Sequence, residues 1–76
     1  FSEPAHTLVA EGLALGRVSS DLPSDCLEAH LRIQGMAASL RGANKLLRIG
    51  EAQFLTLADD VQRLREHTQR RNDDKL

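Results

Sequence analysis

The sequence predicts an all-α fold, with a short N-terminal helix and a long helical hairpin that form a three-helix bundle or a coiled-coil-like hairpin. Two observations support this prediction. Apolar residues recur every seventh position in two rows three places apart, which is typical of the seam between packed helices. We call these rows the seam: Cys26, Ile33, Leu40, Leu47, Phe54, Val61 and Thr68, and Ala29, Met36, Ala43, Gly50, Leu57 and Leu64. The second observation is that two Phe are the only aromatic residues, so aliphatic side chains supply the core, which suits helices better than strands.

The length of 76 residues indicates a single small domain over residues 1–76. A domain of this size buries only about 60% of the surface that its unfolded chain exposes, so we expect a small free energy of unfolding. Because the chain begins at Phe1 rather than Met, we expect either a domain of a longer protein or a chain that lacks its first residues.

The first helix is expected over residues 1–16. Pro4 falls in its first turn, where the missing N–H is not needed, and Gly16 suits the position just past its end. A linker is expected over residues 17–24, because serines and Asp cluster there and Pro23 stops a helix from continuing.

Helical periodicity then continues over residues 25–71, and the sequence leaves open whether one helix or two cover this stretch. A break is possible at Gly42, which Asn44 follows as a potential N-cap, or at Gly50, after which we find no good cap. The unbroken seam favours one helix, whereas glycines inside a helix are costly. We favour a hairpin broken at 42–44 or at 50, keep one long helix as the alternative, and expect residues 72–76 to fray.

A second apolar stripe lies opposite the seam on the second helix. It is large in its first half and small in its second half, which would let another backbone approach closely. A helix that is apolar on two sides is covered on both, by a neighbouring helix or by another chain. We therefore predict that this stripe binds a protein partner; its residues are Leu27, Leu31, Gly35, Ala38 and Gly42.

DNA binding is the main alternative. The spacing Ala38-x3-Gly42 resembles the turn core of a helix-turn-helix motif, and Arg41, Lys45 and Arg48 would then contact phosphates. The motif favours Ile or Val where Arg48 stands, and three basic residues on a helix are more often a solvated face. The interleaved acids and bases after residue 58, Asp60 among them, are likewise expected to form a solvated face with salt bridges rather than a nucleic-acid-binding patch.

Catalytic and metal-binding patterns are weak. Cys26 and His30 stand four residues apart near a helix start, a spacing that could activate a thiol, but no orienting acid or oxyanion donor is identifiable. A zinc site needs three or four ligands, and His6 and His67 have no partner at metal-binding spacing. We therefore expect no enzymatic activity, no cofactor and no metal.

The net charge of −1 gives no general attraction for nucleic acid or for membrane surfaces. No apolar run approaches the roughly 18 residues of a membrane span, and the single cysteine favours a reducing, cytoplasmic or otherwise intracellular compartment. The function we predict is protein–protein interaction or homo-oligomerisation through apolar helix faces. An adaptor, a chaperone, a regulatory subunit and an effector domain all fit this prediction.

Overall fold

Three helices make up almost all of the described chain. The computed structural model describes residues 2–18, 21–41 and 49–74, and within these ranges it contains α1 (Ser2–Val18), α2 (Ser24–Arg41) and α3 (Glu51–Asp74) and no strand. The predicted all-α class is therefore confirmed. Two separate helices, α2 and α3, lie within the stretch that the sequence left open, in agreement with the favoured hairpin.

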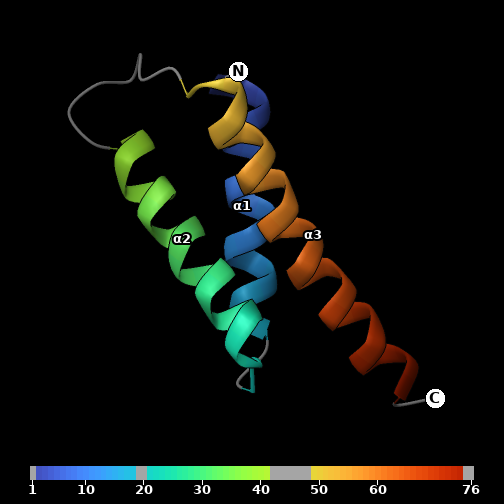
Figure 1. Ribbon diagram of the computed structural model, residues 1–76. Coiled ribbons are helices and arrows are strands. Elements are labelled where there is room, and N and C mark those ends of the chain that lie inside the picture. Colours follow the sequence, from blue (N-terminus) through green and yellow to red (C-terminus); the bar gives the residue numbers. More distant parts are fainter. Residues whose placement is uncertain (1, 19–20, 42–48, 75–76) are drawn as a thin grey trace.

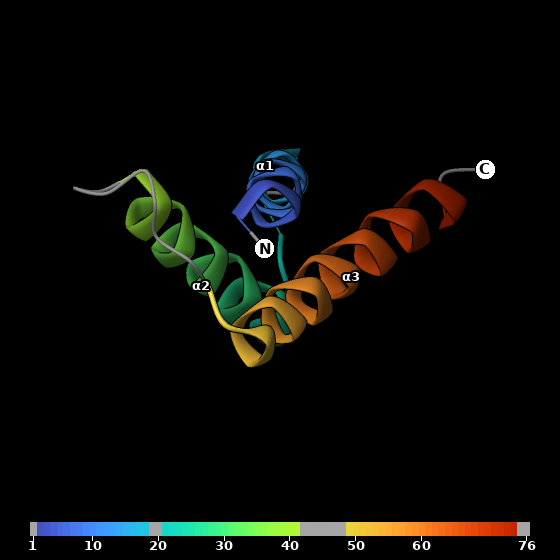
Figure 2. The same cartoon turned by 90° about the horizontal axis from the view of Figure 1, so that it is seen from above.

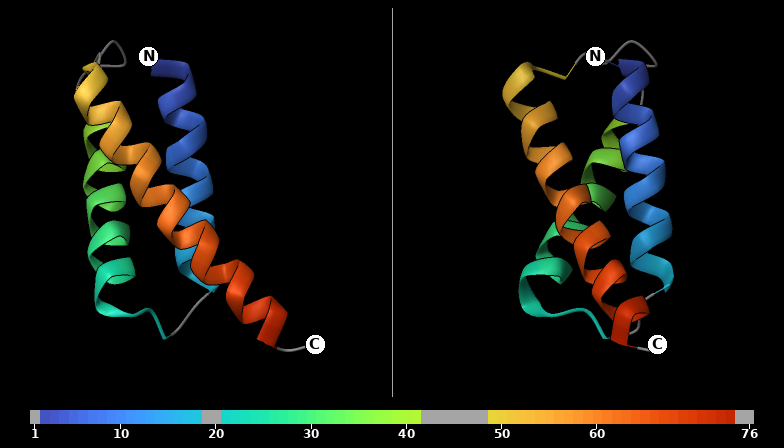
Figure 3. Two further views of the ribbon diagram at one scale, coloured as in Figure 1. Left: turned by 45° about the vertical axis from the view of Figure 1, so that its right-hand side comes forward. Right: turned by 90° about the vertical axis from the view of Figure 1, so that its right-hand side faces the viewer.

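The helices run alternately along the long axis of the molecule. α1 and α3 run in one direction and α2 runs in the other, and each helix packs against the other two (Figures 1 and 3). Seen along α1, the helices α2 and α3 form an open V, and α1 lies in its mouth (Figure 2). The molecule measures 43 × 19 × 18 Å, because α3 extends past the end of the other two helices.

Local polar groups define where α2 and α3 begin. The Pro23 carbonyl accepts the N–H of Leu27 at 2.9 Å, so the first turn of α2 follows directly from the proline. In α3 the Gly50 carbonyl accepts the N–H of Phe54 at 3.0 Å, and the Gln53 side chain accepts the N–H of Gly50 at 2.9 Å. Gly50 is thus the N-cap of α3. The hydrogen bond from its N–H to the Gln53 side chain is one of the two hydrogen bonds of a capping box. This cap was not predicted from the sequence.

The helix ends differ from the predicted ones. α1 continues to Val18 because Gly16 lies inside the helix against the ring of His30, and no described glycine has a positive φ. α3 continues to Asp74, supported near its end by a hydrogen bond of 3.4 Å from Gln69 to Asp73. The predicted break at 42–44 lies outside the described residues.

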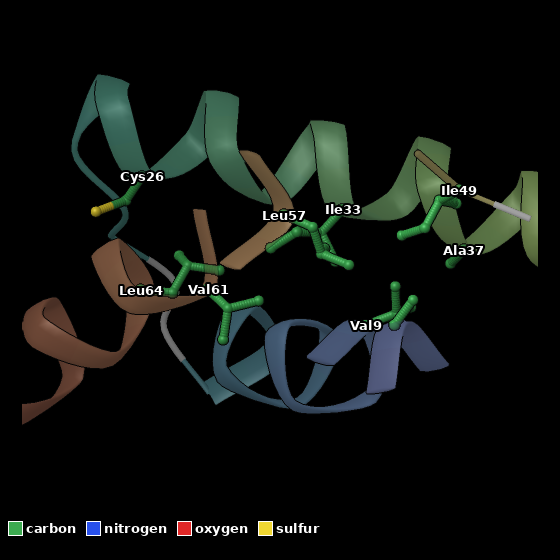
Figure 4. Close-up of a cluster of buried hydrophobic side chains, with 9 residues drawn as sticks. Val9, Cys26, Ile33, Ala37, Ile49, Leu57, Val61 and Leu64 are labelled. Atoms are coloured by element: carbon green, nitrogen blue, oxygen red, sulfur yellow. The ribbon is translucent and has the colours of Figure 1, made fainter. Parts of the chain in front are cut away.

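The core lies between the three helices and consists of small and medium-sized apolar side chains that converge from all of them (Figure 4). Most described seam residues belong to it, whereas Met36 and Phe54 are half-buried and Gly50 is exposed. The side chains of Leu40, Ala43 and Leu47 lie outside the described part of the chain. The buried apolar residues are Ala5, Val9, Cys26, Ala29, Ile33, Ala37, Ile49, Leu57, Val61 and Leu64.

Gly12 of α1 lies against side chains of both other helices. A Cβ added there would stand 2.7 Å from Ile33 Cδ1 and 3.2 Å from Val61 Cγ2. Ile33 and Val61 are both fully buried, so either side chain would have to shift within the core. The absence of a side chain at Gly12 therefore lets α1 pack against α2 and α3 at the same position.

Candidate interaction surface

The most prominent uncovered apolar feature of the described chain lies on α2. Leu27 is 47% exposed and Leu31 is 56% exposed, and Gly35 and Ala38 beside them are exposed as well. We call these four residues the α2 stripe. The fifth predicted partner-binding residue, Gly42, lies outside the described residues. α2 forms one edge of the molecule, with α1 and α3 both on its other side (Figure 1).

Helical geometry explains why the α2 stripe faces outward. The core side of α2 carries Cys26, Ala29 and Ile33, and at 100° per residue the stripe lies on the opposite side of the same helix. Gly35 has open space around it, since an added Cβ would meet no atom within 4 Å. Its lack of a side chain is thus not required by packing within the chain, in contrast to Gly12.

An ion pair joins α2 to α3. The Arg32 guanidinium donates from Nε to Asp60 Oδ2 at 2.9 Å and from Nη2 to Asp60 Oδ1 at 2.8 Å. Asp60 is only 2% exposed, whereas about half of the Arg32 side chain reaches solvent. The hydrogen bonds from the guanidinium to the Asp60 carboxylate, together with the charge of that carboxylate, raise the pKa of Arg32.

The prediction that Asp60 lies on a solvated face was wrong, although a salt bridge, as expected for these charges, is present at Asp60. A signal was nevertheless present, because Arg32 and Asp60 each directly precede a seam residue, Ile33 and Val61. Such positions flank the seam and commonly carry the charges that pair between neighbouring helices. Asp60 is buried because α2 covers it and supplies the guanidinium that balances its charge.

A groove of about 370 Å³ lies beside this ion pair, between α2 and α3. Its surface is mainly apolar, and both oxygens of Asp60 are already engaged by Arg32. The groove can therefore accommodate an apolar side chain but offers no unpaired carboxylate for acid–base chemistry. It is lined by Arg32, Met36, Ala52, Gln53, Thr56, Leu57 and Asp60.

The Cys26 thiol is 3% exposed and points toward α3, where its Sγ lies 3.9 Å from the carbonyl oxygen of Arg63. Burial, with a smaller contribution from the charge of Asp25, raises the pKa of Cys26 above its ordinary value of 9.0. The thiol is therefore protonated at neutral pH and a poor nucleophile. A polar cavity of about 360 Å³ adjoins it, and its walls carry both acidic and basic side chains.

His30, the other member of that predicted pair, packs against α1 instead. Its ring lies on Gly16, and its Nε2 is buried without a hydrogen-bond partner. The contact explains the glycine at that position, since a Cβ would overlap the ring. The structure thus places the cysteine and the histidine of the predicted pair against different helices.

The candidate DNA-contacting residues lie mostly outside the described part of the chain. Lys45 and Arg48 fall wholly outside it, and Arg41 is placed only as the last residue of α2. In the described ranges, no three or more His, Cys, Asp or Glu side chains are grouped to hold a metal ion. Nor is any helix in those ranges both long and apolar enough to span a bilayer.

Comparison of the chain with protein-family models, with curated proteins and with solved structures found no match in any of the three. A function for the chain must therefore be inferred from its own surface.

Proposed function

We propose that the chain is a protein–protein interaction module that binds a helical partner through the α2 stripe. The observation that supports this proposal is the exposure of Leu27 and Leu31 on a helix whose opposite side already completes the core. Fully burying a leucine is worth about 1.5–3 kcal/mol, so two half-exposed leucines retain a substantial driving force for docking.

A helix is the partner that fits the spacing of the stripe. Its residues follow one another at intervals of four, four and three, which keeps them on one side of α2 for three turns. A second amphipathic helix laid along α2 would contact all four residues through its own i, i+3, i+4 and i+7 positions. Gly35 has no side chain and Ala38 has only a methyl group, which allows the two helix axes to come close together.

The test is a selection from a displayed library of amphipathic helical peptides, with the folded chain as bait. We expect enriched peptides that bind the wild-type chain and bind Leu31→Lys at least tenfold more weakly. Leu55→Lys is the matched control, because Leu55 is 61% exposed on α3 and belongs to no part of the α2 stripe. Enriched peptides that bind Leu31→Lys as tightly as wild type, or no enrichment at all, would refute the proposal.

A further inference from the structure

The α2 stripe changes in size along its length. Leu27 and Leu31 lie in the first half of α2 and project into solvent. Gly35 and Ala38 lie in the second half, where little or no side chain separates the helix backbone from solvent. A partner helix that fits this surface must therefore be small where the stripe is large, and large where the stripe is small. From this match we propose that a second copy of the chain occupies the stripe, with the two α2 helices antiparallel. The inference rests on the proposed function and names the partner.

An antiparallel pair satisfies this requirement with one sequence. The leucines of each copy then lie against Gly35 and Ala38 of the other copy, and the contact repeats about a two-fold axis near the middle of α2. A parallel pair would instead set leucine against leucine and glycine against glycine, which separates the helices at one end and leaves a gap at the other.

The charges at the start of α2 agree with the antiparallel arrangement. Asp25 and Glu28 are both exposed there. A parallel pair would set these carboxylates of the two copies side by side, whereas an antiparallel pair separates them to opposite ends of the contact, which favours the antiparallel orientation.

The size of the contact predicts a weak dimer. α2 has 18 residues and is therefore about 27 Å long. A contact between two such helices falls at the low end of the area that specific complexes bury. We expect reversible dimerisation with a Kd in the range of about 1–100 μM, which is typical of transient association.

Sedimentation equilibrium over a wide concentration range tests the proposal. Wild type is expected to dimerise, and Leu31→Lys and Gly35→Glu are each expected to be monomeric. An equimolar mixture of these two variants should recover at least half of the wild-type dimer, because the ammonium group introduced in one copy then faces the carboxylate introduced in the other. Gly35→Glu introduces no clash within its own chain, since the space around Gly35 is open. Leu55→Lys is the control and should dimerise like wild type.

Three outcomes would overturn the inference. A wild-type chain that stays monomeric at millimolar concentration excludes a second copy as the occupant. Dimerisation that survives both Leu31→Lys and Gly35→Glu places the contact elsewhere, and a mixture that stays monomeric excludes the antiparallel pairing. In each case the peptide selection still decides separately whether the stripe binds other helices, so failure of this inference and failure of the proposed function are distinguishable.

Discussion

At the scale of single residues, two glycines in helices have opposite environments. Gly12 lies where an added Cβ would press on the buried side chains of Ile33 and Val61, and Gly35 lies where it would meet nothing. We predict that Gly12→Ala lowers the free energy of unfolding by about 1–2 kcal/mol, because overpacking outweighs the gain in helix propensity. The measurement is urea unfolding at low micromolar concentration.

Gly35→Ala is the matched control for that substitution. It should raise the free energy of unfolding by about 0.5–1 kcal/mol, because alanine restricts the unfolded chain and contacts nothing in the fold. Equal effects of the two substitutions would mean that Ile33 and Val61 do not restrict the space at Gly12.

The sequence indicated some of these residue roles and missed others. The seam periodicity identified Ile33, Val61 and Leu64 as core, because a regular spacing along one helix is local information. The role of Gly12 was not predictable in this way, since its neighbours come from two other helices. The α2 stripe was likewise visible as a pattern, but only the packing of α1 and α3 on the opposite side leaves it uncovered.

At the scale of the elements, the ion pair between Arg32 and Asp60 connects α2 to α3. We predict that Arg32→Met destabilises the fold more than the double substitution Arg32→Met with Asp60→Leu. The single change leaves a buried carboxylate without its partner, whereas the double change replaces the pair by apolar side chains. Denaturant unfolding of wild type and of these two variants makes the comparison.

Arg63→Met provides the control for this prediction. Arg63 pairs with Asp59 at 3.0 Å within α3, and Asp59 is largely exposed while Arg63 is partly exposed, so the loss of this pair should change stability little. If Arg32→Met lowers the free energy of unfolding no more than Arg63→Met does, the stability of the fold with Asp60 buried does not depend on the ion pair with Arg32.

At this scale the sequence predicted the existence of the helices better than their ends. The start of α3 was predicted only as one of two possible breaks, because Gly50 acts as N-cap only together with the side chain of Gln53, a pattern that differs from the usual Ser or Asp cap. The end of α1 was missed because Gly16 has a tertiary role against His30, which overrides its ordinary use as a helix terminator.

At the scale of the whole molecule, folding and association are linked. The core is built from small and medium-sized side chains, and so small a domain has little stability in reserve. A dimer formed through the α2 stripe would add to that stability by mass action, because association favours only the folded chain. The melting temperature of the protein should therefore depend on its concentration.

We predict a rise of about 3–5 °C in the melting temperature for each tenfold increase in concentration above the Kd. The rise follows because each tenfold step adds about 0.7 kcal/mol per chain to the stability of a dimer, and a domain of this size gains roughly 4–8 °C per kcal/mol. Circular dichroism from about 1 μM to about 1 mM measures it. Leu31→Lys should melt at one temperature throughout this range, whereas Leu55→Lys, equally polar but on α3, should retain the wild-type slope. If the melting temperature of the wild type does not change with concentration, the bundle is stable as a monomer. Its exposed leucines would then bind a partner other than a second copy of the chain.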